Sequence, residues 1–318
     1  MQPIEGNTLS SSPFNAEPPP DLGVLVYIDN RKETIEEFYW LYKSMLFSDL
    51  FTRAKIIAAC HPDALNQVPV DENITLISSV PYIDRNTEWE GYPYINSVGN
   101  LCEQRVFDEC KKYRYILKTD CDTFTTPALL DFSPSGLCFG FGAYAYEEEV
   151  RNKLSECSLH WGFPHSGLHN VGASVLGPSN QVCDFLSAQM DYCHKLLREE
   201  FSNYEGKWPG WCKNVLTMYA GELALRCTYP QQCSLGFLDH FPVSTRKLGS
   251  DVLHIHAWHT NEYWSKFDFR AGKYSHINPD QIDRTTLGGY CHWLAQADIN
   301  NVAGEKPARQ LMSTSARQ

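Results

Sequence analysis

The sequence has no long apolar run and little positive charge. No stretch of its 318 residues approaches the roughly 20 consecutive apolar residues that a membrane-spanning helix needs, and residues 1–20 lack the apolar core of a signal peptide. Lys and Arg number 27 against 38 Asp and Glu, which gives a formal net charge of −11. Such an acidic excess repels a phosphate backbone. We therefore expect no membrane span in this chain and no nucleic-acid partner.

Zinc-type cysteine spacing and internal repeats are also absent. The 12 cysteines include no Cys-x-x-Cys pair and join no histidine at zinc spacing, which excludes the common zinc modules. We expect most of them to be buried thiols of a cytoplasmic protein. A secretory-lumen enzyme with disulfides is the alternative, and the single glycosylation sequon at Asn73 fits that alternative.

Strands and helices alternate along most of the chain. Residues 1–21 are rich in Ser, Pro, Asn and Glu and predict a disordered leader, and residues 301–318 predict a flexible tail. Between them, residues 22–300 are expected to form one catalytic domain. Short apolar runs such as "GVLVYID", "RAKIIAAC" and "YRYILKTD" are separated by helical stretches such as "TIEEFYWLYKSMLF". This order is typical of a doubly wound α/β sheet with mostly parallel strands.

In such sheets ligands bind at the carboxyl ends of the strands. Asp29 and Asn30 end the first strand, so they are candidates to touch a nucleotide base or ribose. A turn followed by a helix start would explain both residues equally well.

The segment "YILKTDCDTF" carries the strongest chemical signal. Side chains two residues apart on an extended segment point to one side, so Asp120 and Asp122 are expected to converge. Two carboxylates at the end of a strand suit Mg²⁺ or Mn²⁺, which keep positions for substrate phosphates. A solvated turn in an acidic chain is the alternative explanation.

This segment resembles the strand and D-x-D motif of GT-A glycosyltransferases, and it is similar to the "KTDDDTF" form of galactosyltransferase-like families. The resemblance implies a Rossmann-like three-layer α/β/α fold and a divalent cation that bridges the phosphates of a nucleotide sugar. Three later segments follow in the order of glycogenin-like members. "NVGASVLGP" matches the sugar-pocket strand at Asn170 and Gly172, and "YAGELAL" puts Glu222 at the acidic position beside the donor sugar.

The third later segment, "DVLHIHAWHT", has the form of the strand whose histidine completes the metal site. His254 and His256 share one face of an extended strand, so either could be the ligand. An imidazole suits Mn²⁺ better than Mg²⁺, so Mn²⁺ is the expected cofactor and Mg²⁺ the alternative. Structural histidines, a buried asparagine and a solvent-facing glutamate are the corresponding alternatives for these segments.

Positive charge is expected near the diphosphate. The candidates are Arg85, Arg105, Lys118, and Lys266 or Arg270, although a charge on a helix such as Arg105 often lies on a solvated face. The resemblance also implies a catalytic carboxylate, for which Glu222 and Asp239 in "GFLDHFP" are the candidates. The chain departs from the galactosyltransferase-like pattern by lacking the later Glu-Asp-Val segment, and from glycogenin-like members by "GEL" in place of Asp-Gln. Retention or inversion therefore stays open.

The sequence thus predicts a metal-dependent glycosyltransferase of glycan biosynthesis. It would move a hexose or pentose from a UDP- or GDP-sugar to a hydroxyl of a glycan, protein, lipid or small molecule. One alternative is a haloacid-dehalogenase-like phosphatase, which also uses D-x-D, with Asp120 as nucleophile and Asp122 as acid and base. That family's later paired-aspartate motif is absent, and Phe124 stands where it wants Thr or Val. A non-catalytic nucleotide-sugar or carbohydrate-binding module is the other alternative.

Overall fold

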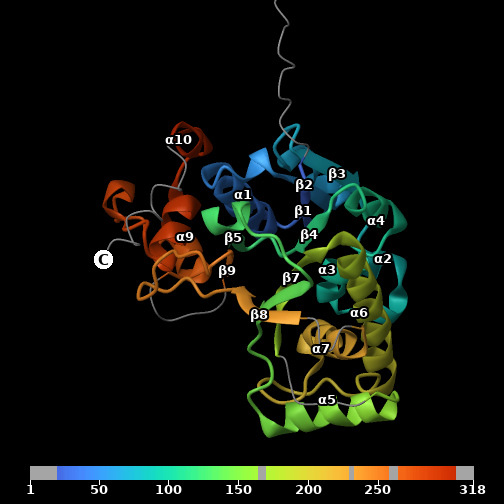
Figure 1. Cartoon of the computed structure of the whole chain (residues 1–318). Coiled ribbons are helices and arrows are strands. Elements are labelled where there is room, and N and C mark those ends of the chain that lie inside the picture. Colours follow the sequence, from blue (N-terminus) through green and yellow to red (C-terminus); the bar gives the residue numbers. More distant parts are fainter. Residues whose placement is uncertain (1–19, 164–169, 229–232, 258–263, 306–318) are drawn as a thin grey trace, which may run out of the picture.

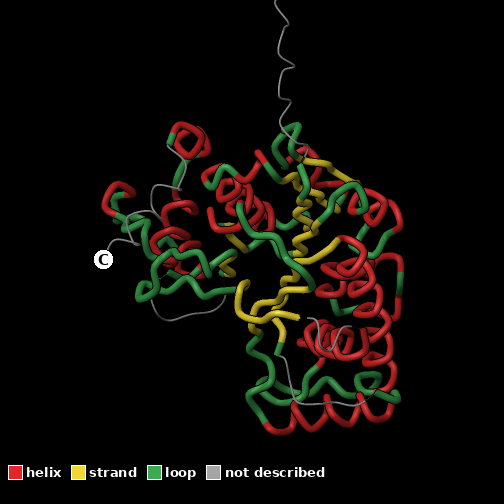
Figure 2. The backbone as a smooth tube through the Cα atoms, in the orientation of Figure 1, coloured by secondary structure: helices red, strands yellow, loops and turns green. Residues whose placement is uncertain are grey.

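The fold centres on a seven-stranded sheet in a computed structural model that describes residues 20–163, 170–228, 233–257 and 264–305 (Figures 1 and 2). The strand order is β3-β2-β1-β4-β7-β6-β8, and within it only β7 runs against the other strands. The strands are β1 (Leu22–Ile28), β2 (Ala54–Cys60), β3 (Ile74–Ser78), β4 (Tyr115–Lys118), β6 (Leu137–Phe141), β7 (Val171–Pro178) and β8 (Cys233–Leu238). A mostly parallel sheet is what the alternating sequence predicted, and that prediction is confirmed.

Helices cover both faces of this sheet. The helices are α1 (Lys32–Phe47), α2 (Tyr82–Arg85), α3 (Asn96–Gly99), α4 (Gln104–Cys110), α5 (Glu148–His160), α6 (Ser179–Glu199), α7 (Leu216–Thr228), α8 (Lys266–Arg270), α9 (Leu287–Gln296) and α10 (Ile299–Gly304). On β1, Val24 and Val26 belong to the apolar cluster that contains side chains of α1, whereas Leu25 belongs to the cluster on the opposite face, which contains side chains of α4, α6 and α7. All seven residues of β1 are buried, since neighbouring side chains point to opposite, covered faces. The molecule is therefore a three-layer α/β/α structure.

A second, two-stranded sheet joins distant parts of the chain. It pairs β5 (Thr123–Thr125) with β9 (His254–His256) in antiparallel fashion. Trp40 of α1, Phe124 of β5 and Tyr290 of α9 belong to one apolar cluster that includes Ile255 of β9. In Figure 1, α9 lies beside β5 and β9. This cluster holds the β5–β9 pair against α1.

The chain ends meet the expectations only in part. Residues 1–19 and 306–318 lie outside the described residues, so the expected leader and tail stay predictions there. Residues 301–304 belong to α10, because Val302 is buried in the apolar cluster that α1 and α9 share. The expected tail therefore begins later than residue 301.

All twelve cysteines lie in the described residues and are free thiols, and most of them are buried. In the part of the chain that the structure describes, no helix combines the length and the apolar character that crossing a membrane requires.

Candidate metal centre

Asp120 and Asp122 lie on a bend between β4 and β5. The chain leaves the central sheet after Lys118 and enters β5 at Thr123, so the two aspartates are not on one extended strand as the sequence suggested. In the β5–β9 register Thr123 faces His256, and the backbone N–H of the next residue, Ala257, donates to the Asp122 carbonyl oxygen at 2.9 Å. The two-stranded sheet therefore places His256 next to the aspartates.

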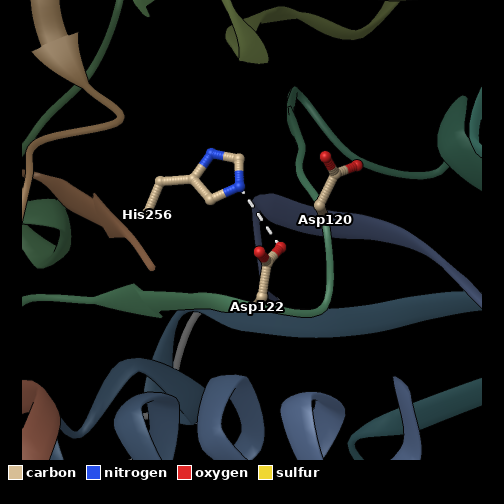
Figure 3. Close-up of side chains that lie close together, drawn as sticks. All are labelled: Asp120, Asp122 and His256. Atoms are coloured by element: carbon tan, nitrogen blue, oxygen red, sulfur yellow. Dashed lines mark ion pairs between the residues drawn. The ribbon is translucent and has the colours of Figure 1, made fainter. Parts of the chain in front are cut away.

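The three side chains form a possible cation site. Asp120, Asp122 and His256 each offer one ligand atom, and these three atoms lie within 4.8 Å of one another (Figure 3). The distance from His256 Nε2 to Asp122 Oδ1 is 3.2 Å. An ion with ligands at about 2.1 Å spaces adjacent ligand atoms by about 3 Å. The Asp122–His256 distance of 3.2 Å fits this spacing. Two carboxylates and an imidazole suit Mn²⁺.

Positive charges surround the two aspartates. Lys266 Nζ donates to Asp122 Oδ2 at 2.5 Å, and Lys118 Nζ donates to Asp120 Oδ1 at 3.2 Å. Burial would raise the pKa of Asp122, but His256 and Lys266 outweigh that effect and hold the pKa far below its usual range. Burial alone would lower the pKa of His256, but Asp122 and Asp239 raise it to about 10. A bound cation would therefore compete with these charges for the same carboxylates.

A cavity of about 510 Å³ opens beside the cluster. It lies at the carboxyl ends of the neighbouring parallel strands β1 and β4, and Tyr27, Asp29, Asp120, Asp122 and Lys266 all line it. Asp29 is therefore in the expected cleft, where Arg31 pairs with it at 3.3 Å. Asn30 is exposed and is not among the residues that line the cavity.

His254 is buried and separate from the cluster, although it shares a strand with His256. Its Nδ1 accepts from the backbone N–H of Asp239 at 3.2 Å, and its Nε2 is hydrogen-bonded to Thr119 Oγ1 at 2.8 Å. Burial lowers the pKa of His254 to about 4. Both nitrogens are thus bound by the protein, so the structure brings His256 and not His254 to the two aspartates.

Asp239 is also buried and lies behind His256. Its Oδ1 is 3.1 Å from His256 Nδ1, and its two oxygens accept from Ser174 Oγ at 2.7 Å and from the Ser174 backbone N–H at 3.1 Å. Burial would raise the pKa of Asp239, but His256, His254 and Ser174 lower it to about 2. The carboxylate faces the histidine strand and does not line the cavity beside Asp120.

Glu222 is fully buried on α7, away from the residues that line the cavity. Its Oε1 accepts from Arg226 Nε at 3.0 Å, and its Oε2 accepts from the Tyr144 hydroxyl at 3.0 Å. The motif order of the sequence put Glu222 beside a donor sugar, whereas the structure places it in an interior ion pair.

The segment that contains Asn170 and Gly172 adjoins Asp239. Asn170 has a φ of 50° and donates from Nδ2 to the Gly142 carbonyl oxygen at 2.6 Å. A Cβ at Gly172 would lie 2.0 Å from Asp239 Oδ2, so only glycine admits the carboxylate there. This segment supports the histidine strand, and neither residue lines the cavity.

Two of the candidate arginines lie elsewhere. Arg85 and Arg105 both pair with Glu103, at 2.8 and 2.6 Å. Neither is among the residues that line the cavity. Of the five expected cations, the structure brings Lys118 and Lys266 to the aspartates, and Arg270 lines the cavity.

Glu37 is a part of the site that sequence reasoning missed. It lies on α1 and lines the cavity, where Lys266 Nζ at 3.4 Å and Arg270 Nη2 at 2.6 Å bind its carboxylate. Burial and the charge of Asp122 raise its pKa. One feature of the sequence could have identified Glu37. It is a charged residue one helical turn before the apolar Leu41, so it lies on the side of α1 that packs inward.

Comparisons with known proteins give a family without an assigned activity. The family described as "Domain of unknown function (DUF7164)" matches residues 18–317. No curated protein matches this chain. One similar solved structure is an active-site mutant of LgtC, which is 10% identical over 84% of this chain and 83% of that chain, with a TM-score of 0.44. The three-layer α/β/α fold is defined by the strand order of the sheet and by the helices on both of its faces.

Proposed function

The chain belongs to the family described as Domain of unknown function (DUF7164), and we propose that it is a metal-dependent glycosyltransferase that uses a nucleotide-diphosphate sugar. The observation that carries the proposal is the meeting of Asp120, Asp122 and His256 from two segments far apart in the chain. The D-x-D resemblance of the first segment and the histidine-strand resemblance of the second support the same function independently of this geometry.

The donor set fits a divalent cation. Asp120, Asp122 and His256 would hold Mn²⁺, or Mg²⁺ as the alternative, which would supply a Lewis acid to the leaving diphosphate. Both of these carboxylates already form ion pairs: Lys118 pairs with Asp120, and Lys266 pairs with Asp122. Because they would offset negative charge in the cavity, we assign both lysines to diphosphate binding.

The cavity has the size and polarity for the rest of the donor. Its volume of about 510 Å³ is within the common range for small-molecule sites. The hydroxyl of Tyr27 is buried in its wall and has no hydrogen-bond partner in the described residues. Buried polar groups are normally hydrogen-bonded, so a shift of the wall that uncovered this hydroxyl would offer it to the nucleoside, alongside Asp29, which lines the cavity.

Ligand-dependent melting tests the proposal. A ligand at 100 times its dissociation constant stabilises the folded protein by about 2.7 kcal/mol, which raises the melting temperature of a chain of this size by roughly 5 °C. We expect one member of a UDP, GDP and nucleotide-sugar panel to give this shift with Mn²⁺ and to lose it with EDTA.

Two aspartate variants sharpen the test. Asp122→Ala should abolish the shift, whereas Asp108→Ala, which removes an exposed carboxylate on α4, should leave it unchanged. Release of nucleotide diphosphate with sugar transfer separates an enzyme from a module that only binds. Phosphate release from simple monoesters would instead favour a phosphatase that uses Asp120. No shift with any nucleotide would contradict the transferase proposal.

A further inference from the structure

We propose that Asp239 is a positioning residue that holds His256 in the tautomer and orientation needed to bind a cation. The inference rests on the proposed metal site and adds a role that lies outside the three ligands. His256 uses its two ring nitrogens in opposite directions: Nε2 is 3.2 Å from Asp122 Oδ1, and Nδ1 is 3.1 Å from Asp239 Oδ1. In Figure 3 the second nitrogen is turned away from both Asp120 and Asp122.

The hydrogen bond to Asp239 selects one tautomer. An ionised carboxylate can only accept a hydrogen bond, so Asp239 requires a proton on Nδ1 of His256. Of the two neutral forms of the ring, only the one with its lone pair on Nε2 keeps this bond. That lone pair then points toward Asp122 and Asp120. Metal-binding histidines commonly donate their other ring nitrogen to a carboxylate in this way.

Asp239 is itself fixed from several sides. Its side chain is fully buried and accepts from both the hydroxyl and the backbone N–H of Ser174. The missing Cβ atoms of Gly140 and Gly172 leave room for the carboxylate, since each would lie within 2.6 Å of Asp239 Oδ2. The backbone of Asp239 has a φ of 55°, in the left-handed region that Asp and Asn tolerate best among residues with side chains. A carboxylate held this firmly can fix the ring that it binds.

His254 shows that placement on this strand does not by itself make a ligand. Its Nδ1 accepts from the backbone N–H of Asp239, so its proton lies on Nε2, which faces Thr119. His254 thus helps to hold Asp239 and carries the opposite tautomer from the one proposed for His256. The two histidines have different roles because Asp239 offers its backbone N–H to one and its carboxylate to the other.

Mn²⁺ binding to the full chain tests this role. The affinity is measured from the electron paramagnetic resonance signal of free Mn²⁺, and direct ligation by imidazole from the ¹⁴N coupling of bound Mn²⁺. We expect Asp239→Asn, which keeps size and tolerates the left-handed backbone, to weaken Mn²⁺ binding about 10- to 100-fold. It should also lose much of the ¹⁴N coupling when Mn²⁺ is saturating. His256→Gln gives the reference spectrum without coupling.

The outcomes separate this inference from the proposed function. Wild-type protein that binds Mn²⁺ with ¹⁴N coupling, together with an Asp239→Asn variant that binds it equally well, would overturn the positioning role and leave the metal site standing. Wild-type protein that binds no Mn²⁺ would overturn both. If Asp239→Asn fails to fold, Ser174→Ala decides, because it loosens the carboxylate and leaves His256 untouched. We expect it to weaken Mn²⁺ binding several-fold, and an unchanged affinity would overturn the inference.

Discussion

Replacing Glu222 separates a catalytic from a structural role for this carboxylate. The motif order of the sequence puts Glu222 beside a donor sugar, whereas in the structure it forms an ion pair with Arg226 in which both side chains are almost fully buried. Glutamine keeps the shape and a carbonyl oxygen that can accept from Arg226 and Tyr144, but it removes the negative charge. Glu222→Gln therefore removes the carboxylate charge that pairs with the buried guanidinium of Arg226.

The expected cost follows from burial. Removing one partner of a buried ion pair destabilises a protein by about 3–5 kcal/mol, which for a chain of this size lowers the melting temperature by roughly 5–9 °C. The double variant Glu222→Leu with Arg226→Met should recover most of this loss, because apolar replacement of a whole buried pair is often neutral. Glu156→Gln is the matched control. It breaks an exposed pair with Lys153 on α5, and such pairs contribute at most about 1 kcal/mol.

Thermal melting and nucleotide binding are the assays. We expect Glu222→Gln to melt well below the wild type and, at a temperature where it is folded, to bind Mn²⁺ and nucleotide as the wild type does. The reasoning would be refuted if Glu222→Gln melted within about 2 °C of the wild type and lost sugar transfer. That result would restore the catalytic role that the sequence predicted.

Two further changes test the support of the site and the pH dependence of stability. Gly172→Ala would place a Cβ 2.0 Å from Asp239 Oδ2, so we expect Mn²⁺ affinity to fall about 10-fold. Gly304→Ala, where a Cβ meets nothing within 4 Å, should not change it, and equal affinities for the two variants would argue against the glycine cradle. Burial lowers the pKa of His292 to about 4 from 6.5, so its contribution to stability is fully present above pH 6.5 and is lost as the pH falls toward 4. Urea unfolding measures this effect. Between pH 7.5 and pH 4.5, protonation of His292 should lower the free energy of unfolding of the wild type by up to about 3 kcal/mol. The His292→Gln variant should not show this decrease. An unchanged pH dependence in that variant would contradict the assignment.

Local sequence was enough to predict the layers of the fold. In β1 the apolar run is continuous because both faces of a central parallel strand are covered, and this pattern can be read without a structure. The sequence was also enough to predict that Asp29 and Asp120 lie at the same edge of the central sheet. They follow β1 and β4, which are parallel neighbours and therefore end on the same side. The bend between β4 and β5 could not be read, because it depends on the pairing of Thr123 with a strand more than a hundred residues away.

Charged residues were the hardest to place from sequence. In the sequence, Lys118, Arg85 and Arg105 were equivalent candidates for diphosphate binding. In the structure, Lys118 forms an ion pair with Asp120, whereas both arginines pair with Glu103. The positions of long charged side chains are set by the nearest opposite charge in space, which short motifs do not contain. Glu37 was missed for the same reason, because its partners lie on α8.

The sequence by itself determined the α/β alternation, the D-x-D segment and the strand with two histidines. Those features depend on local apolar patterns and on residue types two positions apart. Only the tertiary structure distinguished His254 from His256, because both share one face of β9 and differ in the partners that follow β4 and β8 in the chain. The β5–β9 register sets His256 beside Asp122, and the Asp239 backbone N–H and Thr119 bind the nitrogens of His254. Which histidine lies beside the two aspartates is therefore set by hydrogen bonds between segments that are distant in sequence.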